Sequence, residues 1–267
     1  MHPELFSIGP FPIRSYGVML AISFFFGVMY VKYVTKRDNK QFDPYLTLSY
    51  ILIFCGVIGA RVSYVLFHLS DFQGRWLDSF NPFAGNEFGI SGLNLYGGVI
   101  LSIIGGFLYC KFKKMSITET FDYFAPTLAF GLGITRIGCF LNGCCFGTPT
   151  DLPWGISFPE GSLPYYVFQN QRLHPAQLYS SMYGLGLFFI LHYLLKRKSF
   201  NGQVVAVLFM VEAVFRYAIE SVRYYEDAMY VSIAGFHPTY NNIISICLFL
   251  LGVAIYITQS KNKLKLS

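Results

Sequence analysis

The chain has 267 residues, of which 54% are hydrophobic, 13% are charged and 28 are phenylalanine. Soluble domains carry charge on about a quarter of their residues, so this composition excludes an ordinary soluble domain and favours a polytopic membrane protein. The net charge of +6 does not indicate a nucleic-acid partner, because the basic residues form no groove or stripe.

The lysines lie in four short clusters, each of which follows an apolar run. Cytoplasmic loops of membrane proteins are enriched in Lys and Arg close to the ends of the spans. The clusters therefore predict cytoplasmic segments at about 35–44, 111–116, 196–202 and 260–267. Outer-side segments are predicted at about 1–15, 70–92, 139–174 and 226–240.

The apolar runs between these segments predict about seven spans, with the amino terminus outside and the carboxyl terminus in the cytoplasm. In chain order they cover about 16–33, 45–69, 93–112, 117–138, 180–196, 203–225 and 242–259. Residues 1–15 are too rich in proline and too poor in basic residues for a cleaved signal peptide. Residues 139–174 are too short for a separate domain, and we expect a small outer cap. The predicted fold is a single all-α integral membrane domain over residues 1–267.

The basic residues outside the lysine clusters are all arginines, which the topology places inside spans or on the outer side. They are Arg14, Arg61, Arg75, Arg136, Arg172, Arg216 and Arg223. A planar guanidinium fork suits phosphate and carboxylate better than an ammonium does. Any one of these arginines could simply extend its side chain to the membrane–water interface. Binding of an anionic ligand explains all seven better.

The segment 131–147 begins as an apolar, helix-compatible run and ends as a loop dense in glycine and cysteine. Arg136 lies where the run leaves the predicted membrane, a costly position unless an anion or carboxylate meets it. The glycines allow tight turns whose N–H groups face an anion. Either an anion site or a re-entrant turn with an interfacial arginine fits this segment.

The predicted span 203–225 is the most polar of the seven. Glu212, Arg216, Glu220 and Arg223 follow at i, i+4, i+8 and i+11, which predicts one stripe along a helix. Charged groups in a span face the bundle interior and pair there. The stripe is therefore either part of a functional site or a structural ladder of ion pairs.

The six cysteines divide by position. Cys55, Cys110 and Cys247 lie in predicted spans as small apolar residues, whereas Cys139, Cys144 and Cys145 lie on the predicted outer side. Disulfides form on that side, and we expect Cys139 to pair with Cys144 or Cys145 rather than zinc to bind. No Walker loop, HExxH, GxSxG or dinucleotide-binding motif is present.

Six segments together resemble the bacterial phosphatidylglycerol–prolipoprotein diacylglyceryl transferase family over nearly the whole chain. The most specific is the signature Arg-Ile-Gly-Cys-Phe-Leu-Asn-Gly at 136–143, with Gly147 after it. The others are residues 9–17, 59–61 (Gly-Ala-Arg), 96–98 (Tyr-Gly-Gly), 172–179 (which include His-Pro-Ala-Gln-Leu-Tyr) and 212–223. The resemblance implies a bacterial inner-membrane enzyme without cofactor or metal. It implies transfer of a diacylglyceryl group from phosphatidylglycerol to the lipobox cysteine of a preprolipoprotein signal peptide, which forms a thioether and releases glycerol 1-phosphate.

The resemblance also implies site residues. Catalytic roles fall on Tyr16, Tyr96, Arg136, Arg216 and Glu220. By the same resemblance, the residues expected to bind phosphatidylglycerol are Arg61, Gly97, Gly98, Arg136, Asn142, Gly147, His174, Gln177, Arg216 and Arg223. The chain departs from the common family pattern at Tyr96, where many members have histidine, and at Cys139, Cys144 and Ser180.

This chemistry suits the residue types. Attack by a thiol at the glyceryl carbon leaves negative charge on the departing phosphate, which two arginines stabilise without a metal. A free thiol has a pKa near ~8.5, so a base or a cationic field must favour the thiolate. Glu220, Tyr96 and His174 all remain candidate bases at this point.

Two other classes of function fit part of the pattern. An anion or lipid transporter would also line its interior with arginines, but the sequence shows no internal repeat. A non-catalytic lipid-binding protein would share the fold, but would not need Arg136, Arg216 and Glu220 together. Formation of a thioether product, as opposed to lipid extraction alone, separates these classes.

Overall fold

The computed structural model describes residues 1–9, 11–72, 94–225 and 237–266. The predicted outer segments 70–92 and 226–240, with Arg75, therefore lie largely outside the described residues. The chain forms two compact units, one of residues 1–7, 12–27 and 118–267, the other of residues 8–11 and 28–117. Each unit is described by itself below.

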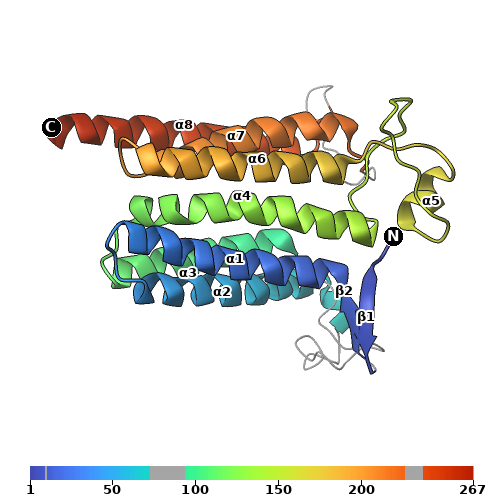
Figure 1. Cartoon of the computed structure of the whole chain (residues 1–267), viewed down its shortest axis with the longest axis horizontal. Coiled ribbons are helices and arrows are strands. Elements are labelled where there is room, and N and C mark those ends of the chain that lie inside the picture. The colour runs from blue at the N-terminus through green and yellow to red at the C-terminus, as the bar shows by residue number, and fades with distance from the viewer. Residues whose placement is uncertain (10, 73–93, 226–236, 267) are drawn as a thin grey trace. The chain divides into compact units, whose positions relative to one another are not determined.

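The described residues are mainly helical (Figure 1). The long helices are α1 (Ser15–Arg37), α2 (Asp43–Phe67), α3 (Leu95–Phe112), α4 (Ile117–Asn142), α6 (Ala176–Arg197), α7 (Gln203–Ile219) and α8 (Tyr240–Leu266). A short helix α5 (Leu163–Phe168) lies between α4 and α6. The prediction of a purely helical chain is wrong at the start, because β1 (Glu4–Ile8) and β2 (Phe11–Arg14) pair into a two-stranded sheet.

Among the described residues, five helices are long and apolar enough to cross a membrane: α1, α2, α4, α6 and residues Tyr240–Lys263 of α8. A shorter apolar helix covers Tyr96–Phe112. These helices expose many large apolar side chains, which a bilayer would cover. The chain is therefore a multi-pass membrane protein, while the prediction of seven spans and of their direction stays a prediction.

Two predicted boundaries near the signature are wrong. The predicted span 117–138 continues as helix α4 through Asn142, since its first break is Gly143, whose φ of +76° suits glycine. Gly138 lies inside the helix and packs closely on Tyr16, since a Cβ there would lie 3.1 Å from the Tyr16 Cα. The predicted span 203–225 ends as α7 at Ile219, so Arg223 does not continue one helical stripe.

In the second unit, α2 and α3 cross closely at glycines. A Cβ on Gly98 would lie 2.7 Å from the Gly56 carbonyl oxygen, and one on Gly97 would lie 2.8 Å from Ser63 Oγ. Asn94 begins α3, since its side chain accepts a hydrogen bond from the Tyr96 N–H at 3.0 Å. Small residues here allow the close helix approach that membrane proteins use for packing.

In the first unit, a buried carboxylate fixes the start of α7. Asp122 of α4 is fully buried and accepts hydrogen bonds from the backbone N–H groups of Gly202, Val204 and Val205 at 2.8–3.0 Å. Lys198 pairs with the same carboxylate at 3.0 Å. Because the first N–H groups of a helix lack partners within it, Asp122 satisfies them and ties α7 to α4.

The connection between α4 and α6, residues 143–175, has a small apolar core of its own. Phe146, Phe158 and Leu173 are buried there, and Phe168 of α5 packs against them. Phe146 also stacks on Tyr224 with ring centroids 5.6 Å apart. This connection therefore has a core of its own and contacts the segment that follows α7, while its place as a cap on the outer side stays a prediction.

Candidate functional site

Three of the motif segments meet at Gly147. Its N–H donates to the His174 carbonyl at 3.1 Å, and it forms an antiparallel bridge with Arg223. On either side, the Thr148 N–H donates to the Val222 carbonyl at 2.9 Å and the Tyr224 N–H donates to the Phe146 carbonyl at 3.1 Å. The signature loop therefore lies between the His174 segment and the Arg223 segment, held by backbone hydrogen bonds.

Gly147 has no room for a side chain. A Cβ there would lie 2.5 Å from the His174 carbonyl oxygen and 2.6 Å from the Val222 carbonyl oxygen. Both oxygens already accept hydrogen bonds from this loop, so neither backbone can retreat without breaking them. The pairing also explains why α7 gives way to the turn Glu220–Val222 and then to extended backbone at Arg223, with φ −96° and ψ 139°.

A buried network orients Arg216. Its Nη2 lies 3.3 Å from Glu220 Oε1 and donates to the Tyr225 hydroxyl at 3.2 Å. Both oxygens of the Glu220 carboxylate accept hydrogen bonds, Oε1 from Tyr225 at 2.6 Å and Oε2 from Thr239 at 2.7 Å. Asn241 donates to the same tyrosine hydroxyl at 3.1 Å. Glu220 is thus fully engaged, and its charge balances an arginine that is itself partly exposed.

Arg136, in the last two turns of α4, shares electrostatic partners with Arg216. Glu212 and Tyr225 both interact with Arg136, and both interact with Arg216. Cys139 and Cys145 also lie in the electrostatic range of Arg136. The two arginines that the sequence singled out therefore belong to one charged region of the first unit.

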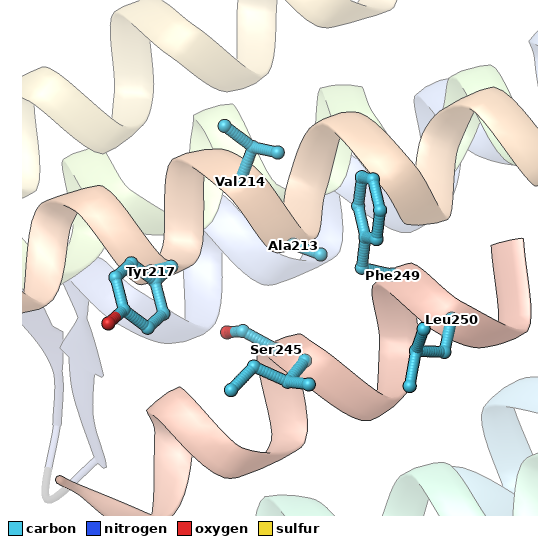
Figure 2. A pocket seen from close by; sticks show the side chains of 7 residues that line it. Ala213, Val214, Tyr217, Ser245, Phe249 and Leu250 are labelled. Carbon is cyan, nitrogen blue, oxygen red and sulfur yellow. The ribbon is translucent and has the colours of Figure 1, made fainter. Parts of the chain in front are cut away.

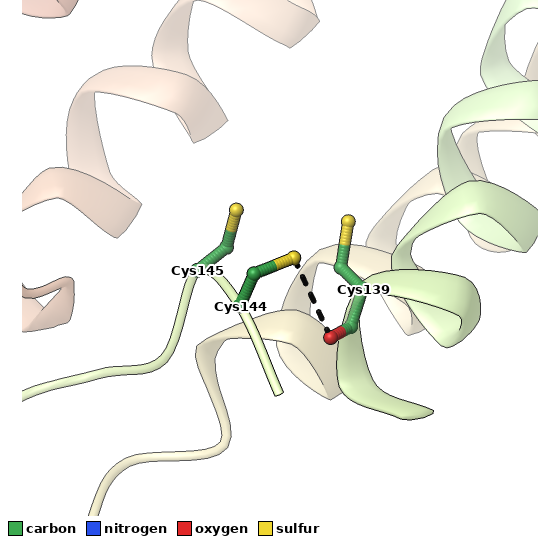
Figure 3. Close-up of side chains that lie close together, drawn as sticks. All are labelled: Cys139, Cys144 and Cys145. Atoms are coloured by element: carbon green, nitrogen blue, oxygen red, sulfur yellow. Dashed lines mark hydrogen bonds between the residues drawn. The ribbon is translucent and has the colours of Figure 1, made fainter. Parts of the chain in front are cut away.

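The cysteine-rich part of the signature brings three sulfurs together. The Sγ atoms of Cys139, Cys144 and Cys145 all lie within 4.8 Å of one another, and all three are free thiols (Figure 3). Two left-handed residues shape the loop, Gly143 at φ +76° and Cys145 at φ +62°. Hydrogen bonds with the other two thiols lower the pKa of Cys145, and the charges of Arg223 and Arg136 lower it further.

His174 and Gln177 contact this loop from the start of α6. Gln177 is 1% exposed and donates from Nε2 to the Cys144 carbonyl at 2.8 Å. His174 Nδ1 lies 3.3 Å from the Tyr179 hydroxyl, which accepts a hydrogen bond from Trp154 Nε1 at 2.7 Å. The histidine is therefore held by α6 and by the connection.

Several side-chain polar atoms are buried without a hydrogen-bond partner in the described part of the chain, among them Oε2 of Glu212. Two of them belong to the segments that flank the signature loop: Oε1 of Gln177, an acceptor, and Nε of Arg223, a donor. The Arg223 guanidinium also lies 4.8 Å from the ring centroid of Tyr225. An unsatisfied buried group costs roughly 1–3 kcal/mol, so a pair of them near one loop suggests a ligand with both a donor and an acceptor.

Tyr16 and Asn142 border the same region. Tyr16 of α1 packs on Gly138 and interacts electrostatically with Arg136 and with the three cysteines. Asn142 is the last residue of α4, and its side chain hydrogen-bonds with the Cys144 thiol. Both residues thus lie beside the signature loop.

Four of the predicted site residues lie in the second unit. Arg61 is buried, and its guanidinium carbon lies 5.5 Å from the Tyr64 ring centroid and 5.4 Å from that of Phe72. The Tyr64 ring stacks on the His68 ring, with centroids 4.2 Å apart. Tyr96 is about half exposed, while Gly97 and Gly98 pack against α2. Their predicted roles in catalysis and lipid binding stay predictions.

An apolar groove of about 400 Å³ runs between α7 and α8 (Figure 2). It is lined by Ala213, Val214 and Tyr217 of α7 and by Ser245, Ile246, Phe249 and Leu250 of α8. Asn241 of α8, which donates to Tyr225 in the Arg216 network, lies one helical turn before Ser245. One end of the groove is therefore one helical turn along α8 from that network.

Sequence reasoning missed three residues of the network. Tyr225, Thr239 and Asn241 hold Glu220 and Arg216, yet they belong to no motif that we recognised. Tyr225 follows Arg223 by two residues. In extended backbone this spacing puts two side chains on the same face, but the sequence did not reveal that α7 ends at Ile219. Thr239 and Asn241 come from the start of α8, and no local pattern links them to Glu220.

A sequence model of the prolipoprotein diacylglyceryl transferase family matches residues 3–258. The chain is 32% identical to the phosphatidylglycerol–prolipoprotein diacylglyceryl transferase of Campylobacter hominis, over 97% of this chain and 91% of the relative. It is 33% identical to that of Desulfotalea psychrophila, over 98% and 94%. It is 28% identical to that of Finegoldia magna, over 97% and 96%.

Proposed function

The chain belongs to the prolipoprotein diacylglyceryl transferase family, and we propose that it binds the phosphate of its lipid substrate between Arg136 and Arg216. It is a membrane transferase of lipoprotein biosynthesis that transfers the diacylglyceryl group of phosphatidylglycerol to a prolipoprotein. This is the first step of lipoprotein maturation. The observation that carries the proposal is the Arg216–Glu220–Tyr225 network, which lies in the same charged region as Arg136.

The proposed acceptor is the thiol of the lipobox cysteine in a preprolipoprotein signal peptide. Its thiolate attacks the glyceryl carbon that carries the phosphate ester. A carbon–sulfur bond forms, the carbon–oxygen bond to phosphate breaks, and the electron pair leaves with glycerol 1-phosphate. The leaving group gains one negative charge, so donors aimed at its oxygens stabilise the transition state more than the ground state.

The Glu220 carboxylate supports this step as a positioning group. Its two oxygens accept hydrogen bonds from Tyr225 and Thr239, and Oε1 also pairs with Arg216. These contacts fix the guanidinium by a charge-assisted interaction. Tyr96, His174 and Glu220 remain the candidate bases, together with the cationic field of the arginines, which itself favours a thiolate.

The unsatisfied atoms beside the signature loop suit the phosphoglycerol headgroup. Arg223 Nε would donate to a phosphate oxygen, and Gln177 Oε1 would accept from a glycerol hydroxyl. We assign one acyl chain to the groove between α7 and α8, because that groove is apolar and its Ser245 lies one helical turn from Asn241 of the Arg216 network (Figure 2). Asn142 and Gly147, of the same unit as Arg216, complete the proposed headgroup site, while the roles of Arg61, Gly97 and Gly98 in lipid binding rest on the family resemblance alone.

The proposed setting is the bacterial cytoplasmic membrane. Seven spans place the amino terminus outside, the lysine clusters in the cytoplasm and the α4–α6 connection on the outer face, where lipoprotein precursors would meet it. Labelling of single cysteines at positions 165 and 198 from either face of sealed vesicles tests this direction. Labelling of both from the same face would contradict it.

The function itself is tested with the purified protein, phosphatidylglycerol and a synthetic lipobox peptide. The expected result is a peptide whose mass increases by one diacylglyceryl group, with release of an equal amount of glycerol phosphate. A peptide with serine in place of the lipobox cysteine is the control. Extraction of lipid without a change in peptide mass would instead support a non-catalytic lipid-binding protein or a transporter.

A further inference from the structure

The chain carries a cluster of three thiols that the proposed transfer reaction does not use. Cys139 lies in the last turn of α4, and Cys144 and Cys145 follow directly after the Gly143 turn. Their Sγ atoms lie within 4.8 Å of one another, gathered on the same side of the loop (Figure 3). A single disulfide would account for two of these sulfurs and leave the third without a role.

The backbone of this loop is arranged to bring the sulfurs together. Cys145 has φ +62°, a conformation that costs a residue with a side chain about 1 kcal/mol or more unless its surroundings hold it there. The Cys144 N–H donates to the Cys139 carbonyl at 3.1 Å, and Gln177 donates to the Cys144 carbonyl at 2.8 Å. The surroundings thus hold a strained turn whose result is the convergence of three thiols.

We propose that Cys139, Cys144 and Cys145 bind one soft metal ion, Zn²⁺ or Cu⁺, through three thiolates. With metal–sulfur bonds of about 2.3 Å, three sulfurs around one ion lie roughly 3.8–4.0 Å apart. The present separations require the sulfurs to close by less than about 1 Å to reach that geometry. Thiolate ligands select soft ions over Mg²⁺ or Ca²⁺.

The charge around the cluster fits an anionic metal–thiolate group. Three thiolates with a divalent or monovalent ion carry a net negative charge, and Arg223 and Arg136 both act electrostatically on Cys145. The bound ion would fix the loop that leads to Gly147, so its role is structural and separate from the chemistry of the transferred group.

The test is metal binding by the full-length protein in detergent, reduced and under anaerobic conditions. Zn²⁺ and Cu⁺ are titrated separately, and metal retained after desalting is measured by mass spectrometry. We expect about one equivalent of at least one ion per chain. Substitution of Cys139, Cys144 or Cys145 by serine should weaken retention at least tenfold, whereas Cys247→Ser, on α8, should leave it unchanged.

A second measurement needs no variant. In the unmodified protein, the bound ion should protect three thiols from an alkylating reagent, and a chelator should expose them again. Retention that is equal in the three serine variants, or protection of fewer than three thiols, would overturn the proposal. So would a Cys139–Cys144 or Cys139–Cys145 disulfide, with no bound metal, in protein purified without reductant. None of these readouts depends on transfer activity.

Discussion

Gly147→Ala should damage both stability and turnover, because three motif segments meet at this residue. The new methyl group would lie 2.5 Å from the His174 carbonyl oxygen and 2.6 Å from the Val222 carbonyl oxygen. Ordinary contacts start near 3.4 Å, so one or both backbones must move by almost 1 Å. Overpacking typically costs about 1–3 kcal/mol, and each backbone hydrogen bond that breaks costs a further ~0.5–1.5 kcal/mol.

We therefore expect Gly147→Ala to lose about 2–4 kcal/mol of stability, seen as a lower midpoint of thermal unfolding in detergent. Movement of the Arg223 segment by a fraction of an ångström to 1 Å should lower turnover by up to a hundredfold. The matched control is Gly186→Ala in α6, where a Cβ meets nothing within 4 Å. Equal behaviour of the two variants would refute the idea that Gly147 holds the three segments together.

Three further predictions concern other parts of the first unit. Asp122→Ala should lower the free energy of unfolding by about 3–5 kcal/mol, because Lys198 and the first N–H groups of α7 lose their buried partner. Thermal unfolding measures this, and an unchanged midpoint would contradict it. Glu220→Gln should lower kcat at least tenfold in protein that is still folded at the assay temperature, with a lower unfolding midpoint, since it removes the buried charge that orients Arg216. Normal kcat would leave Glu220 a purely structural role. Leu250→Trp should raise KM for long-chain phosphatidylglycerol more than for a short-chain analogue, because it narrows the α7–α8 groove; equal KM changes would exclude the groove as an acyl site.

The membrane class of the fold was predictable because composition and the lysine clusters are global features. The apolar runs located each long helix to within a few residues at most ends. The exceptions were places where tertiary contacts decide. Gly138 allows close packing on Tyr16 inside α4 and does not end that helix, and beyond Ile219 the backbone pairs with the signature loop instead of continuing α7.

The candidate site was predictable only as far as its charged and motif residues. The i, i+4 spacing of Arg216 and Glu220 predicts their ion pair, and the structure contains it. Tyr225 and Thr239, which hold Glu220, are separated from each other by a stretch of chain without a periodic signal. The sequence predicted that Cys139 would lie close to Cys144 or Cys145, but as a disulfide, whereas all three are free thiols. The convergence of the third sulfur depends on the left-handed backbone at Gly143 and Cys145, which no sequence pattern indicated.

The most direct test of the account is the turnover of Arg216→Lys, compared with Arg216→Ala, Arg136→Ala and the control Arg197→Ala at the far end of α6. Lysine keeps the charge at position 216 but loses the planar fork that pairs with phosphate. The kcat of Arg216→Lys, Arg216→Ala and Arg136→Ala should each fall about a hundred- to thousandfold, which corresponds to a loss of ~2.7–4 kcal/mol of transition-state stabilisation. The kcat of Arg197→Ala should remain normal. Near-normal turnover of folded Arg136→Ala or Arg216→Ala would contradict the phosphate clamp, even though the family assignment would stand.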